Sequence, residues 1–139
     1  MKNHQKFFHR PIGMISLLLI MIFAMACGGG QQQAQQQKLK EVKETTKMQL
    51  ERIIDDIETR IEYLDEQIEE ASGELEENLK EVRAELEQQK KSIENEIEKV
   101  MAASVESWQD VLASATAKYQ EARTKTNEVS KKVREWLED

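Results

Sequence analysis

The chain of 139 residues has little of what compact enzymes usually contain. It holds one cysteine, one proline, five glycines and two histidines, and aromatic residues make up 5% of it. Between residues 38 and 139 there is no proline, cysteine or histidine, and Gly73 is the only glycine. A single cysteine excludes an intramolecular disulfide. Because aromatic side chains dominate thick globular cores, we expect only a thin core between helices.

The same absences argue against catalysis. His4 and His9 both precede the long segment, which therefore lacks the Glu-x-x-His motif of di-iron helical bundles. Elongated helices also offer no enclosed pocket that would shift the pKa of a serine, lysine or carboxylate. We expect no enzyme, no cofactor, no metal site and no small-molecule substrate. The formal net charge of −7 disfavours nucleic acid as a partner.

Charge and helical periodicity are what the chain has in abundance. Charged residues make up 34% of it. In residues 38–139, apolar or small side chains recur every three or four positions, which is typical of an amphipathic helix. This stripe has a mean spacing of about 3.6 residues, between the heptad and the 11-residue repeat, so we expect little supercoiling. Its members are Leu39, Val42, Thr46, Leu50, Ile53, Ile57, Ile61, Leu64, Ile68, Ala71, Leu75, Leu79, Val82, Leu86, Ile93, Ile97, Val100, Ser104, Trp108, Val111, Ala115, Tyr119, Ala122, Thr126, Val129 and Val133.

The pattern predicts an all-α fold of long amphipathic, coiled-coil-like helices over residues 38–139. Breaks are expected near residues 71–73, where Gly73 can end a helix, and near the uncharged residues 101–104. No break gives a single rod, one gives an elongated hairpin, and two give a three-helix bundle. We favour the rod or hairpin, because the apolar phase passes both places unbroken and one glycine costs only about 1 kcal/mol.

The first 30 residues follow another pattern. Three basic residues lie in the first ten positions, residues 12–26 form an apolar run, and Ala26 stands directly before Cys27. A run of this length is short for a membrane span but suits the hydrophobic core of a signal peptide. The order of these features resembles the signal peptide of bacterial lipoproteins. An ordinary secretory signal or an uncleaved anchor is the other interpretation.

The lipoprotein resemblance implies that residues 1–26 are removed and that Cys27 is acylated at its thiol and its new amino group. Several acyl chains on one residue anchor a protein stably, whereas one chain binds only marginally. In that family an aspartate after the cysteine tends to retain the protein in the inner membrane. Gly28 follows here, which implies the outer membrane, with the chain facing the periplasm.

Residues 28–37 read GGGQQQAQQQ and carry neither charge nor apolar periodicity. Together with the lipidated Cys27 they are predicted to form a flexible tether, residues 27–37, between membrane and helices. Because glutamine is a good helix former, the alternative is that the glutamines make the first helical turns.

Residues 100–119 carry few charges and have a broader apolar face than the rest of the stripe. The candidates for binding a partner or a lipid surface in this stretch are Met101, Val105, Trp108, Val111 and Leu112. The other interpretation is that they form the best-packed part of the seam between helices, anchored by Trp108.

Residues 46–122 also resemble a family of small bacterial coiled-coil proteins associated with stress responses. The resemblance lies in a run of acidic and basic helix followed by Ala103-Ser104 and then by Trp108-Gln109-Asp110-Val111-Leu112. It implies a helical fold without catalytic residues.

Two classes of function follow. The first is an envelope lipoprotein with a structural or adaptor role, which self-associates to cover its stripe or binds an envelope protein. The second is an apolipoprotein-like helix that lies on lipid. Residues 51–100 carry 18 acidic and seven basic residues, which anionic lipid would repel. We therefore favour the first class.

Overall fold

The structure is a computed structural model that describes residues 32–138. These residues form three α-helices joined by two short connections: α2 (Gln32–Glu70), α3 (Gly73–Ala102) and α4 (Trp108–Glu138). The predicted all-α class with long helices is confirmed. The predicted signal peptide, Cys27 and residues 28–31 lie outside the described residues.

The first helix starts earlier than the sequence led us to expect. Residues 32–37, assigned above to a flexible tether, are helical, because α2 begins at Gln32. The alternative in which the glutamines form the first turns describes these residues correctly. Glutamine has a helix propensity close to that of leucine, and no glycine follows residue 30 until Gly73.

Both expected breaks occur, so the chain takes the three-helix alternative rather than the favoured rod or hairpin. At the first break, the Ala71 N–H donates to the Gln67 carbonyl at 3.0 Å, and Gly73 has a φ of 65°. Glycine takes this left-handed conformation without the Cβ clash that other residues suffer. The connection of two residues, Ala71 and Ser72, returns α3 antiparallel to α2.

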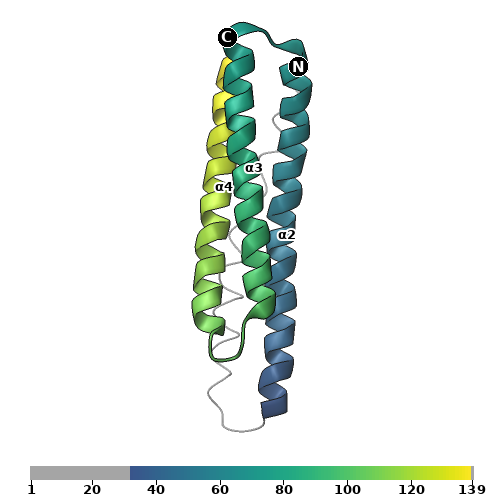
Figure 1. Cartoon of the computed structure of the whole chain (residues 1–139), viewed down its shortest axis with the longest axis vertical. Coiled ribbons are helices and arrows are strands. Elements are labelled where there is room, and N and C mark those ends of the chain that lie inside the picture. The colour runs from purple at the N-terminus through teal and green to yellow at the C-terminus, as the bar shows by residue number, and fades with distance from the viewer. Residues whose placement is uncertain (1–31, 139) are drawn as a thin grey trace. The chain divides into compact units, whose positions relative to one another are not determined.

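Residues 36–139 form one compact unit, in which the three helices lie side by side (Figure 1). Lys90 on α3 pairs with Glu58 on α2, with the Nζ and Oε1 atoms 3.1 Å apart. Lys125 on α4 pairs with Glu85 on α3 at 3.6 Å. The guanidinium of Arg60 on α2 donates to the Ser130 hydroxyl on α4. Each helix therefore contacts both of the others, which makes this unit a three-helix bundle.

The core of the bundle is the predicted stripe, folded onto itself. Large aliphatic side chains from α2 and α3 fill most of it, and α4 adds Trp108 and small residues. The buried residues are Val42, Thr46, Leu50, Ile53, Ile57, Ile61, Leu64, Leu79, Val82, Leu86, Ile93, Glu96, Val100, Ala103, Trp108, Ala115, Ala122, Thr126, Val129 and Val133. Burying the apolar members removes the area that would drive association of an isolated amphipathic helix.

Candidate functional site

The second connection, residues 103–107, holds two serines that bond to each other's backbone. The Ser104 N–H donates to the Ser107 hydroxyl at 2.9 Å, and the Ser107 N–H donates to the Ser104 hydroxyl at 3.2 Å. This reciprocal pattern resembles a capping box, with serine in the place usually held by Glu or Gln, but it lies within the connection, before α4 begins at Trp108. It satisfies the backbone N–H groups of both serines. The turn therefore has a defined conformation and presents Val105 at its tip.

The five predicted binding residues are split between surface and core. The side chains of Met101 and Val105 are exposed, at 40% and 45%. Val111 and Leu112 are half-buried. Trp108 is only 4% exposed, so its indole belongs to the packed seam and is not available to a partner in this structure. The bundle brings Met101 and Val105 together at one end and withdraws Trp108 from them.

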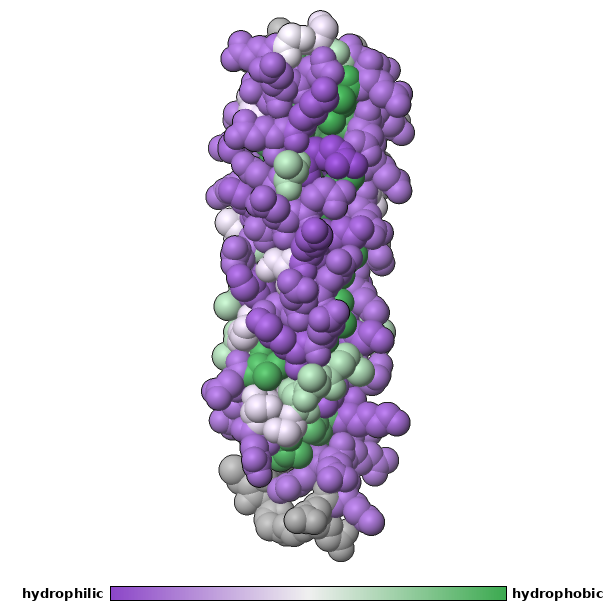
Figure 2. All heavy atoms as spheres, in the orientation of Figure 1, coloured by the Kyte–Doolittle hydropathy of each residue, from purple (hydrophilic) through white to green (hydrophobic). Residues whose placement is uncertain are grey.

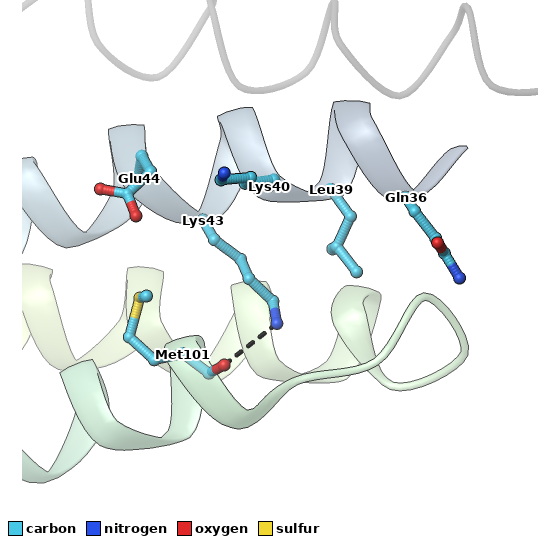
Figure 3. Close-up of a pocket in the computed structure, with 6 residues that line it drawn as sticks. All are labelled: Gln36, Leu39, Lys40, Lys43, Glu44 and Met101. Carbon is cyan, nitrogen blue, oxygen red and sulfur yellow. Dashed lines mark hydrogen bonds between the residues drawn. The ribbon is translucent and has the colours of Figure 1, made fainter. Parts of the chain in front are cut away.

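A shallow hollow of about 240 Å³ lies between the start of α2 and the end of α3 (Figure 3). The Lys43 ammonium donates to the Met101 carbonyl across it, at 3.1 Å. This bond satisfies one of the carbonyl groups that the last turn of α3 leaves open. The sequence alone could not join these residues, since 58 positions separate them. The residues that line the hollow are Gln36, Leu39, Lys40, Lys43, Glu44 and Met101.

This end of the bundle also carries exposed apolar surface. Figure 2 shows green, apolar residues gathered near the lower end of the bundle, while the upper part of this face is mostly hydrophilic. Met101 and Val105 are two of the five large apolar side chains that are exposed among residues 33–138. Leu39, which is half-buried, lines the hollow together with Met101.

One buried polar residue was missed by the sequence analysis. Glu96 on α3 is only 1% exposed, where the predicted stripe had Ile97. The Ser114 hydroxyl on α4 donates to Glu96 Oε2 at 3.2 Å, and the Lys99 ammonium donates to Oε1 at 3.2 Å. A buried carboxylate needs such donors, because its charge is costly to remove from water. Both carboxylate oxygens have a donor, and the Ser114 bond joins α3 to α4, so the role of Glu96 is to position α4 against α3.

Electrostatic effects outside the core are small. A hydrogen bond to Glu58, together with the charge of that carboxylate, raises the pKa of Lys90 above its ordinary value of 10.5. A hydrogen bond to Asp65 raises the pKa of Arg83, and partial burial opposes this change. Both residues carry their full positive charge at neutral pH in any case. These pairs tie α3 to α2 and perturb no group toward acid–base catalysis.

In residues 32–138 no group of three or more His, Cys, Asp or Glu side chains is placed to hold a metal ion. None of the three helices has a stretch long and apolar enough to cross a membrane.

Comparison of the chain with protein-family models, with curated proteins and with solved structures gives no match.

Proposed function

We propose that this protein is a membrane-anchored envelope lipoprotein whose helical bundle has a non-catalytic structural or adaptor role. The single observation that carries the proposal is the position of Cys27. Three basic residues and an apolar run lead up to it, Ala26 directly precedes it, and α2 begins five residues after it. Acylation of a cysteine between an apolar leader and a charged helical bundle gives stable attachment through several chains at once.

The bundle supports an adaptor role through its length and its exterior. Thirty residues of α3 span about 45 Å, which suits a spacer that holds a binding surface away from a membrane. Self-association was expected above because the apolar stripe needed a cover. The three helices now cover it, so contacts with an envelope protein or with a second copy would use the outer surface.

The proposed address is the outer membrane, with the bundle in the periplasm. It rests on Gly28, which stands where an aspartate would imply retention in the inner membrane. A part in the envelope stress response rests on the resemblance of residues 46–122 alone. For the alternative of helices lying flat on lipid, the apolar faces would have to separate from one another, and no observation favours that change.

The lipid anchor is tested with Cys27→Ser in the full chain, followed by cell fractionation and intact mass measurement. We expect the wild-type protein in the membrane fraction, at the mass of a chain that starts at Cys27 and carries acyl groups. The variant should carry no acyl groups, and it should keep residues 1–26 because it is not cleaved. A variant that stays in the membrane at the wild-type mass would refute the proposal.

Gly28→Asp is the matched control, because it alters the neighbouring residue and leaves the thiol in place. It should be acylated and cleaved like the wild type. If the protein is located in the outer membrane, the Gly28→Asp variant should also move to the inner-membrane fraction in density-gradient separation.

A further inference from the structure

We propose that one end of the bundle, formed by the start of α2 and the α3–α4 turn, docks on the phospholipid surface to which the chain is anchored. In this arrangement Met101 and Val105 enter the headgroup region and the bundle stands away from the membrane. The inference rests on the proposed lipid anchor at Cys27. It adds an orientation and a contact surface, and it differs from the alternative in which whole helices lie flat on lipid.

The docking end brings together two segments far apart in sequence. Antiparallel packing places the start of α2 beside the end of α3, and the hydrogen bond from Lys43 to the Met101 carbonyl joins them (Figure 3). The turn that follows presents Val105, whose side chain is 45% exposed. The serine capping described above fixes this turn, so the exposed valine is held in place at the tip.

Apolar exposure alone does not choose an occupant, but chain length does. Gln36, which lines the hollow at this end, lies nine residues after Cys27. Nine residues can span at most about 30 Å, whatever their conformation. The opposite end of α3 lies about 45 Å further along the bundle. An anchor at Cys27 therefore keeps the docking end within reach of the bilayer.

Charge favours the same orientation. Residues 36–50 and 97–112, at the docking end, hold five acidic and five basic residues and are neutral overall. Residues 62–82 and 126–138, at the opposite end, hold twelve acidic and four basic residues, a net charge of −8. The anionic surface of a bacterial membrane repels the acidic end and not the neutral one. Lys40, which lines the hollow and is exposed, can also extend its ammonium group toward phosphates while its stem stays on apolar surface.

The experiment places a photoreactive benzophenone amino acid at Val105 or at Ser72 in the full chain expressed in cells. Both positions are exposed and lie in connections between helices, at the docking end and at the opposite end respectively. After irradiation, mass spectrometry identifies what is attached at each position. We expect phospholipid adducts at position 105, several-fold above those at position 72.

Each other outcome overturns the proposal. A protein attached at position 105 would mean that this end binds a protein partner. Equal lipid adducts at both positions would mean that the bundle does not stand on one end, and no adduct at position 105 would mean that it does not touch lipid. Fractionation of the same cells reports on the anchor separately. If Cys27→Ser stays in the membrane at the wild-type mass, the anchor proposal fails, while the adducts at positions 105 and 72 still decide whether this end touches lipid.

Discussion

The first two helices and the third contribute to the core in different ways. α2 and α3 bury mostly leucine and isoleucine, such as Ile57 and Leu86, which are completely buried. After Trp108, α4 buries only Ala115, Ala122, Thr126, Val129 and Val133. Larger side chains remove more apolar area from water, so α2 and α3 supply most of the hydrophobic stabilisation.

The polar contacts are divided in a complementary way. Between α2 and α3, the pairs of Glu58 with Lys90 and Asp65 with Arg83 lie at the surface. Between α3 and α4, the buried Glu96 accepts a hydrogen bond from Ser114. A small-residue face lets α4 approach closely, and a buried polar contact penalises other registers. Thus α2 and α3 provide most of the hydrophobic stabilisation, whereas α4 provides close packing and a fixed register.

The largest expected effect comes from shortening a large core side chain. Ile57→Ala should lower the free energy of unfolding by about 2–5 kcal/mol, because it removes buried methyl groups and leaves a cavity. Urea unfolding followed by circular dichroism measures this change. Met48→Ala, on the same helix at an exposed position, is the control and should stay within about 0.5 kcal/mol of the wild type. Equal effects in the two variants would mean that α2 does not carry the core.

Enlarging a small residue of α4 tests the close approach of that helix. Ala122 is completely buried, so Ala122→Leu should lower the free energy of unfolding by about 1–3 kcal/mol through overpacking. The same unfolding measurement applies. Ala113→Leu, on an exposed face of α4, is the matched control and should be nearly neutral. A stabilised Ala122→Leu variant would show that α4 packs loosely and would remove the contrast between the helices.

The contact between Ser114 and Glu96 should have a smaller effect. Ser114→Ala removes one donor from a buried carboxylate and should lower the free energy of unfolding by about 1 kcal/mol. In Glu96→Gln, which keeps the shape and removes the charge, the same serine change should matter less. A double-mutant cycle over these four proteins gives the coupling energy, and a coupling near zero would remove the positioning role of Glu96.

The surface pair of Glu58 and Lys90 should make the smallest contribution to stability. The loss of this contribution should be seen only at high pH. The folded-state pKa of Lys90 lies above its ordinary value of 10.5, so the pair's contribution is fully present below that pH. It is lost as the pH rises through the folded pKa. Between about pH 9 and pH 12, the free energy of unfolding should therefore fall slightly more steeply with pH for the wild type than for Lys90→Met. Parallel curves would mean that the pair contributes nothing to stability.

Much of the fold could be predicted from the spacing of apolar residues. The stripe gave the helical class and nearly every buried position, and Gly73 marked the first break because few other residues tolerate a positive φ there. The choice between a rod and a bundle could not be made in this way. Breaking a helix costs little free energy, whereas covering the stripe lowers the free energy by much more. The spacing of the stripe does not show which surface covers it.

The mistaken position in α3 has a different cause. The mean spacing of about 3.6 averaged helices with different local repeats. Within α3 the buried positions Leu86, Ile93, Glu96 and Val100 are spaced as heptads, which buries Glu96 and leaves Ile97 half-buried. A charged residue is a poor candidate for a core position until its partner is known. That partner, Ser114, comes opposite only because the chain turns back at residues 103–107.

The candidate site was predicted in part. The broad apolar stretch around residue 100 pointed to the end of the bundle at which Met101 and Val105 are exposed, and their part in binding stays a prediction. Trp108 was expected either to bind or to pack, and the structure has it packed. The sequence did not show that the start of α2 forms part of the same surface. Lys43 reaches Met101 only because the chain reverses between α2 and α3.

The odd number of helices has a mechanical consequence. Because three antiparallel helices reverse the chain twice, the start of α2 and the end of α4 lie at opposite ends of the bundle. A pulling force applied between these two points runs along the helix axes. Such a force slides neighbouring helices past one another, so that all core contacts between them must break together. A hairpin pulled at its two adjacent ends opens one contact at a time. The bundle should therefore resist a pull along its length better than a hairpin pulled at its two adjacent ends.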